Sequence, residues 1–447
     1  MIRSSSVLGW VRARAFWRAM TIVVCALILL PRLGAKPLSA QPAQVGPLGE
    51  GSHVGTPAEE ALPLAYEAAL ALLEHAPELR ARAAASAQLR AAARDVTALP
   101  ADLTISVEAG PRVHPELKGQ GRLGVIQSFA LAALGDARRA ALSSHASTQD
   151  AERAGQRLYR RLQVSQAWLR THAAHAALGI AQGELQLAET LSQAAERGAE
   201  LAELTRADAA DAAAYAAEAK LGLLSAEGEL IEARLDLTRT LAISDRVLDV
   251  RGEPPQLHEP TPADKAALHA RIETQPALLS LQRQMAALDA RKRELRASYA
   301  SQLSLGVVLD RTDPGAWATL GVVGLTWPLA DRGLRERAEV DAERTALRGR
   351  TEEQRAGLHV EIERLLHEIE HTHETLQHAD ERLLPAIERG LSAREALFRA
   401  GEGTVLEIVV ARRNALGLRL RRLRLHHDFM SALLRFRELS LVVGIAP

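Results

Sequence analysis

The chain has 447 residues, and its 55 lysine and arginine residues are balanced by 55 aspartate and glutamate residues. Nucleic-acid-binding domains usually carry a basic excess, so this balance argues against that class of protein. Hydrophobic residues make up 47% of the chain and aromatic residues only 3%. The apolar part is therefore mostly alanine and leucine, which is typical of long helices rather than of a compact globular core.

The first 40 residues have the form of a secretory signal peptide. A basic segment precedes the short apolar run Met20–Leu30, and Leu38-Ser39-Ala40 offers small residues for cleavage. The run is shorter than the ~20 residues that cross a bilayer as a helix, which disfavours the alternative of an uncleaved anchor. Cys25, the one cysteine, lies in this run. We therefore expect the mature chain to lack disulfides and cysteine-based metal or catalytic sites.

A proline- and glycine-rich linker is expected over residues 41–61, and after it the chain presents one series of elements twice. Each repeat is predicted to contain a helix, a β-hairpin and a long helical hairpin. The predicted bounds are 62–255 for the first repeat, with its β-hairpin at 102–130 and its helical hairpin at 135–248, and 262–445 for the second repeat, with its β-hairpin at 302–328 and its helical hairpin at 333–442. Duplication of this kind is typical of repeat architectures.

The β-hairpins are predicted from alternation of apolar and polar residues. Leu103, Ile105 and Val107 alternate with polar residues, as they would in a strand with one apolar face. Asp313-Pro314-Gly315 is a strong turn signal inside the second hairpin. The first repeat opens with an alanine-rich helical pattern from Leu62 to Val96.

The helical hairpins are predicted from long segments without proline. Residues 135–196 and 203–250 are free of proline, and a helix of about 60 residues would be about 90 Å long. Leu223, Leu230 and Leu237 recur every seven residues, which indicates a coiled-coil seam. The helices are expected to reverse near residues 198–203 and 401–404.

Three interpretations of the four predicted strands are open. Four strands cannot close a barrel, and open sheet edges do not occur in lipid, so a membrane sheet would need several copies of the chain. Two copies would give eight strands and three would give twelve, and both numbers occur in bacterial barrels. The alternatives are a soluble sheet packed on helices, or a periplasmic coiled-coil scaffold without a barrel.

In this order of elements the chain resembles the TolC-like outer-membrane efflux proteins. The strongest local match is the segment from Phe398 to Arg412, which is similar to the second hairpin tip of that family. The segment from Thr326 to Gly333 is similar to its strand-to-helix crossover. Residues 126–131 and 137–140 resemble the CzcC-like heavy-metal branch.

The resemblance implies a mainly α fold with a small β part. Two long antiparallel coiled-coil hairpins per chain would join four strands that contribute to a trimeric 12-stranded outer-membrane barrel. It implies the outer membrane of a Gram-negative bacterium, with the helices in the periplasm and the barrel in contact with lipid. The implied partners are a periplasmic membrane-fusion adaptor and an inner-membrane pump of the RND or ABC type. The implied cargo is small molecules or heavy-metal cations.

The same resemblance places contacts with the adaptor at the hairpin tips. The residues concerned are Gly198, Glu203, Leu204, Gly401, Gly403, Thr404 and Val405. Glu407 matches an acidic position at the pore constriction, and Glu203 is expected to be its counterpart in the first repeat. Gly401 and Gly403 would relax the backbone at the reversal, and the Thr404 hydroxyl would cap the next helix. Alternatively, these are ordinary loop residues, and Glu407 is an acid favoured by the helix dipole.

The sequence His367-Glu368-Ile369-Glu370-His371 spells the motif of zinc metalloproteases, in which two histidines bind zinc and the glutamate is the general base. It lies in a helix predicted to pack in a coiled coil, with no obvious cleft, so a polar helix face is the favoured interpretation. A metal contact of His367, His371 and His378 is the less favoured alternative. No phosphate-binding loop or catalytic triad is discernible. We predict that the chain is not an enzyme and has no cofactor.

Overall fold

The computed structural model describes residues 62–96, 101–110, 120–243, 247–313, 316–328 and 332–441. The chain divides into two units, Met1–Pro57 and Ala58–Pro447, and the described residues all belong to the second. The predicted signal peptide, the linker and most of the turn at residues 313–315 lie outside the described residues. The described part is mainly helical with a small sheet, as the sequence predicts.

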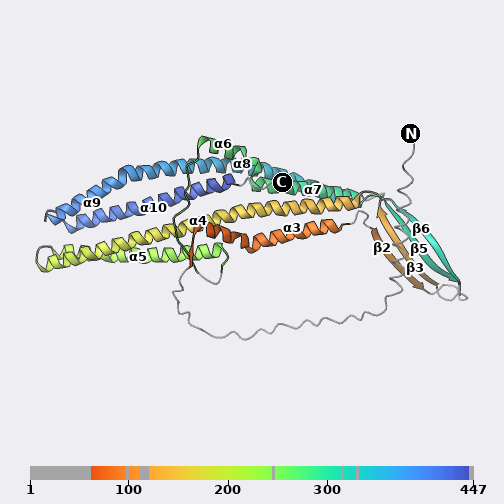
Figure 1. The fold of residues 1–447 in the computed structure, drawn as a ribbon, viewed down its shortest axis with the longest axis horizontal. Helices are drawn as coiled ribbons and strands as arrows, with labels where there is room; N and C mark the ends of the chain where they lie inside the picture. The colour runs from red at the N-terminus through yellow and green to blue at the C-terminus, as the bar shows by residue number, and fades with distance from the viewer. Residues whose placement is uncertain are drawn as a thin grey trace, which may run out of the picture. The chain divides into compact units, whose positions relative to one another are not determined.

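Four antiparallel strands form the larger sheet, in the order β2-β3-β5-β6 (Figure 1). Their bounds are Ala101–Gly110 for β2, Gln120–Ala130 for β3, Gln302–Asp313 for β5 and Ala316–Thr326 for β6. The two hairpins of the two repeats are joined by the pairing of β3 with β5. Since β2 and β6 are the outer strands, each keeps one unpaired edge within the described chain.

The register of the sheet separates an apolar face from a more polar one. Ile105 lies opposite Val125, which lies opposite Val307, and residues that are directly opposite share a face. On the other face, the Ser128 hydroxyl is 3.0 Å from the Ser304 hydroxyl. The apolar face is uncovered, because Val107 is 74% exposed and Val323 is 75% exposed.

Two long helical hairpins make up more than half of the residues that the structure describes (Figure 1). Helix α3 (Pro77–Asp95) leads into the sheet, and the first hairpin consists of α4 (Leu134–Glu200) and α5 (Arg206–Thr240). The second repeat has α7 (Pro276–Ser298), α8 (Leu334–His378), the π-helical turn η3 (Ala379–Leu383), α9 (Leu384–Arg399) and α10 (Val405–Leu441). With 67 residues, α4 is about 100 Å long. No helix among the described residues is both long and apolar enough to cross a membrane.

Short elements near the middle of the helices differ from the sequence-based prediction. The predicted helix at Leu62 begins instead with strand β1 (Leu62–Leu64), which pairs in parallel with β4 (Leu248–Val250). Helix α5 ends at Thr240, before the predicted end of the hairpin at residue 248, and Ala242 then takes a positive φ of 55°. The remaining short elements are α2 (Tyr66–Leu72), η1 (Leu73–His75), α6 (Pro262–Ala270) and η2 (Ile272–Thr274).

Trp168 explains why β1 and β4 form where no local pattern predicts them. Its side chain is fully buried in a cluster that contains Leu64, Leu237 and Leu248. Its indole N–H donates to the Leu64 carbonyl at 3.1 Å, and the hydroxyl of Tyr66 lies 2.9 Å from that of Ser165. Burial of a large aromatic side chain with its polar atom satisfied stabilises the contact between segments that are distant in sequence.

Candidate functional site

The two helix reversals close in the same way. At the first tip, Ala202 has φ 57° and the Glu203 N–H donates to the Gly198 carbonyl at 2.8 Å. At the second, Gly401 has φ 80° and the Glu402 N–H donates to the Leu397 carbonyl at 3.0 Å. Both are helix ends of the Schellman type, in which one left-handed residue lets the chain leave the helix.

The helices that follow the two tips are also capped alike. The Thr205 hydroxyl accepts from the Asp208 N–H at 3.1 Å, and the Thr404 hydroxyl accepts from the Glu407 N–H at 3.3 Å. The expected capping role of Thr404 is confirmed. The counterpart of Glu407 in the first repeat is therefore Asp208, and the expected pairing of Glu407 with Glu203 is wrong. The sequence alone suggests the wrong counterpart because the first tip has Ala202, not a glycine, at its left-handed position. The glycines of the two tips therefore do not occupy equivalent positions.

The predicted contact residues differ in their accessibility. Val405 is 0% exposed, and Gly198 is buried because the Leu204 side chain lies over it, where a Cβ would meet Leu204 Cδ1 at 2.9 Å. Neither residue is accessible to a partner in this conformation. The remaining predicted tip residues are exposed or half-buried: Glu203, Leu204, Gly401, Gly403 and Thr404.

Replacement of Ala202 by glycine should stabilise the protein. An alanine in the left-handed region is strained by about 1 kcal/mol, and glycine is not. We expect Ala202→Gly to raise the thermal unfolding midpoint. The matched control is Ala213→Gly, at an exposed position within α5, which should lower the midpoint because glycine disfavours helix interiors. A lower midpoint for both variants would contradict the role of Ala202 in the turn.

The two tips are packed against each other by an apolar cluster. Val405, Ile408 and Val409 of α10 lie in one cluster with Ala212 and Tyr215 of α5. The cluster also includes the buried residues Ala188, Leu191 and Ala195 of α4 and Ala219 of α5. The α10 side of the second tip is therefore held against the first tip, which makes the two tips one combined surface.

Glu184 and Tyr215 form a buried polar pair behind this surface, and sequence reasoning missed both. The Tyr215 hydroxyl donates to the Glu184 carboxylate, and the Arg413 guanidinium lies 6.0 Å from the centre of the Tyr215 ring. Burial raises the pKa of Glu184, and the positive charges of Arg412 and Arg419 only partly oppose this. The sequence signal was that Tyr215 is the only aromatic residue in alanine-rich α5.

Glu184 should make the helical part pH-sensitive. Because its pKa is raised on folding, the folded state favours the protonated carboxyl, so the contribution to stability is present at acidic pH. It is lost as the pH rises from the ordinary carboxyl range through the raised pKa. We expect Glu184→Gln to remove this dependence and to raise the unfolding midpoint at pH 7 relative to the unchanged protein. Thermal unfolding between pH 4 and pH 8 tests this, and an unaltered pH profile would contradict it.

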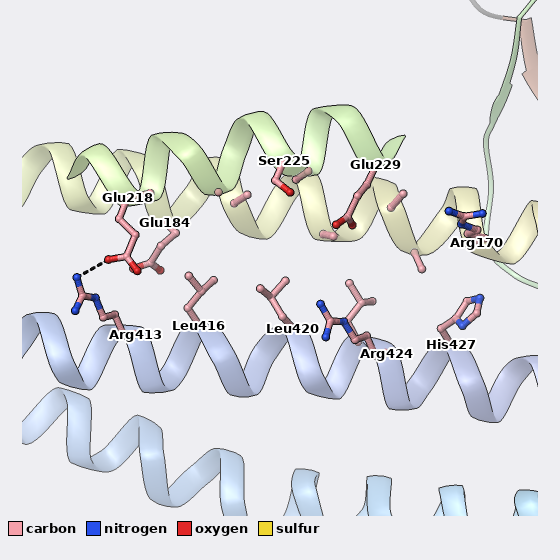
Figure 2. A pocket seen from close by; sticks show the side chains of 18 of the residues that line it. Arg170, Glu184, Glu218, Ser225, Glu229, Arg413, Leu416, Leu420, Arg424 and His427 are labelled. Carbon is pink, nitrogen blue, oxygen red and sulfur yellow. Dashed lines mark ion pairs between the residues drawn. The ribbon is translucent and has the colours of Figure 1, made fainter. Parts of the chain in front are cut away.

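Beyond the tips, α5 and α10 diverge, and a groove of ≈ 770 Å³ lies between α10 and the α4–α5 hairpin (Figure 2). At the end nearest the tips, Glu218 of α5 forms an ion pair with Arg413 of α10. Farther along, Glu229 lies on the α5 side and Arg424 on the α10 side, at the same separation in sequence as the first pair. The floor contains Leu416 and Leu420 of α10. The groove thus has a charged rim that is acidic on α5 and basic on α10.

The histidine motif does not form a protease site. His367, His371 and His378 are exposed on α8, and the Glu368 carboxylate forms an ion pair with Arg435. Glu368 is therefore engaged in packing α8 on α10 and is not free to act as a base. Within the described ranges, no three or more His, Cys, Asp or Glu side chains are grouped as a metal site would require. The metalloprotease interpretation has no support in this geometry.

Comparison with solved structures finds the same fold in bacterial channels. A structure of CusC, described in terms of transmembrane channel formation, matches with a TM-score of 0.66 at 16% identity, over 90% of this chain and 98% of that one. The CmeC outer membrane channel of Campylobacter jejuni gives 0.63 at 12%, over 89% and 94%. The open MtrE outer membrane channel of Neisseria gonorrhoeae gives 0.63 at 14%, over 84% and 88%.

Comparisons at the sequence level find no matching family model and no similar curated protein. The structural matches extend over nearly the whole of each neighbour, so they include the strands as well as both helical hairpins. Because the sequence identities are only 12% to 16%, these structural matches show the fold alone. The chain therefore has the fold of the TolC-like outer-membrane efflux channels.

Proposed function

We propose that the chain is a passive exit duct in the outer membrane of a Gram-negative bacterium, the outer part of a tripartite efflux system. The observation that carries this proposal is a sheet with an uncovered apolar face, joined directly to two long helical hairpins. Soluble proteins rarely leave an apolar face of this kind in water. The duct does no chemistry, and partners supply the energy for transport.

The sheet fits the lipid-facing wall of a barrel made from several copies. Its apolar face would meet lipid, and the face with Ser128, Ser304 and Glu108 would line the lumen. The unpaired edges of β2 and β6 need partners in a bilayer, and the neighbouring copies can supply them. We propose a homotrimer, which gives a 12-stranded barrel.

Helix α5 has a second feature that favours association between copies of the chain, in addition to the unpaired edges of the sheet. Leu221, Leu224, Ile231 and Leu235 of α5 are all at least half exposed. They follow one another at steps of three, seven and four residues. Gly228 divides the step of seven into four and three, so the positions alternate as in a coiled coil. This seam is distinct from the buried one through Leu223 and Leu230. We propose that it packs against a helix of the next protomer.

The combined tip surface is proposed as the docking site for a periplasmic adaptor and, through it, an inner-membrane pump. Its accessible residues are Glu203, Leu204, Gly401, Gly403 and Thr404. The neighbours named above are described as membrane channels, which supports export as the role. The cargo class proposed is small molecules or heavy-metal cations, the latter from the similarity of the first β-hairpin to the CzcC-like branch.

Reversal of the charge at Glu407 tests the duct and its constriction together. Glu407 is exposed in the first turn of α10, and a ring of three such carboxylates would attract cations. We expect Glu407→Lys to reduce the cation selectivity of channels reconstituted in planar bilayers. Glu402→Lys, at the adjacent turn, is the matched control. Channels with unchanged selectivity would remove Glu407 from the pore, and absence of any conductance from the unchanged protein would count against the duct.

A periplasmic scaffold without a barrel is the alternative. It explains the helical hairpins, but it leaves the apolar face of the sheet and the two open strand edges without a function. Extraction distinguishes the two proposals, because a scaffold would be released without detergent and a barrel would not.

A further inference from the structure

A line of exposed histidine and glutamate side chains runs along the outer side of α8. The side of α8 that faces the protomer core is marked by Leu358, Ile362, Leu365 and Ile369, which are buried at steps of four, three and four residues. A position two residues after a buried one lies on nearly the opposite side of the helix, and such positions form a second set. Its exposed members are His367, His371, Glu374 and His378, at the same steps of four, three and four.

The other charged side chains of this segment already have partners. Glu368 pairs with Arg435, Glu370 with Lys265, and His373 Nδ1 lies 2.6 Å from Glu259 Oε1. By contrast, none of the four side chains in the line forms an ion pair with a described residue. The line is thus a set of ligand atoms that the packing of the protomer does not use.

His367 and His371 are arranged as neighbouring ligands on a rigid helix. Their rings lie one helical turn apart, with centroids 6.0 Å apart and planes inclined by 17°. Two histidines at this spacing on one helical face can bind a single divalent ion, with each nitrogen about 2.0–2.1 Å from the metal. Glu374 and His378 provide the next donors along the same line.

We propose that this line binds a divalent transition-metal ion through His367 and His371. Since no three ligands converge among the described residues, water would complete the coordination, and the site would be open and reversible. Imidazole ligands favour copper, nickel and zinc over magnesium or calcium, and the order of affinity should place Cu²⁺ above Ni²⁺ and Zn²⁺. This inference does not depend on the proposed duct.

Equilibrium dialysis of the tag-free, detergent-extracted protein against Ni²⁺ tests the site. We expect saturable binding. His371→Ala should weaken binding by about tenfold or more, because it removes one of the two proposed ligands. His378→Ala should have a smaller effect. His373→Ala is the matched control, since it removes a histidine of the same helix that lies off the line.

Two results would overturn the proposal. One is the absence of saturable Ni²⁺ binding, and the other is equal affinity in His371→Ala and His373→Ala. Because His371 is exposed, its replacement should leave the unfolding midpoint unchanged, and this measurement separates loss of a ligand from loss of the fold. Neither result depends on conductance or export, so failure of the duct proposal would remain distinguishable.

Discussion

Replacement of Gly401 by proline is expected to abolish export while leaving the oligomer intact. Gly401 has φ 80°, whereas the proline ring fixes φ near −65°. Proline would also remove the N–H that donates to the Phe398 carbonyl at 3.0 Å. The second tip could not close in its present form, and the local destabilisation should be about 3 kcal/mol or more. The apolar cluster at the tips contains no strand residue, so the sheet should be unaffected.

Asparagine at the same position is the matched control, because it tolerates the left-handed conformation. We expect Gly401→Asn to retain export, as measured by the sensitivity of cells to a transported compound, and both variants to keep the oligomeric mass of the unchanged protein. Dissociation of the Gly401→Pro oligomer would mean that the tip is needed for assembly. Normal export by that variant would mean that the tip conformation is irrelevant to docking.

Removal of Arg161 should have the largest effect on stability. Glu438 is 2% exposed, and its two carboxylate oxygens accept from the Arg161 guanidinium at 2.6 Å and 2.9 Å. This bidentate pair joins α4 to the C-terminal part of α10. Truncation of the arginine leaves a buried carboxylate without its counter-charge, so we expect Arg161→Ala to destabilise the fold by about 3–5 kcal/mol, measured by denaturant unfolding.

A double replacement separates the buried charge from the packing. When both partners become apolar, as in Arg161→Met with Glu438→Leu, no charge is left unpaired and most of the lost stability should return. If the double variant were as unstable as Arg161→Ala, the effect would come from packing and not from the ion pair. If Arg161→Ala itself were as stable as the unchanged protein, the carboxylate would have to be solvated in solution.

The sequence predicts the architecture where the pattern is local and periodic. Alternation at Leu103, Ile105 and Val107 locates β2, and the long segments without proline locate α4 and the beginning of α5. It fails where the structure depends on contacts between distant segments. Strand β1 pairs with β4, nearly 190 residues away, and the pairing is fixed by burial around Trp168, which no local pattern reveals.

The candidate site shows the same limit. Gly401 marks the second tip in the sequence. At the first tip, Ala202 takes the equivalent conformation, and an alanine gives no such signal. The sequence alone therefore does not identify Asp208 as the counterpart of Glu407. Burial also removes predicted contacts, since Val405 belongs to the apolar cluster between the tips. The pairs behind the tips, Glu184 with Tyr215 and Glu218 with Arg413, join different helices and follow only from the packing.

Assembly of several copies of this chain into one membrane duct is the property on which the proposed function depends. The most direct test is the mass of the detergent-extracted mature protein, measured by light scattering, with its shape from negative-stain imaging. We expect three chains per particle and helical extensions of roughly 100 Å, as a helix of 67 residues requires. A monomer or dimer that stays soluble without detergent would contradict it.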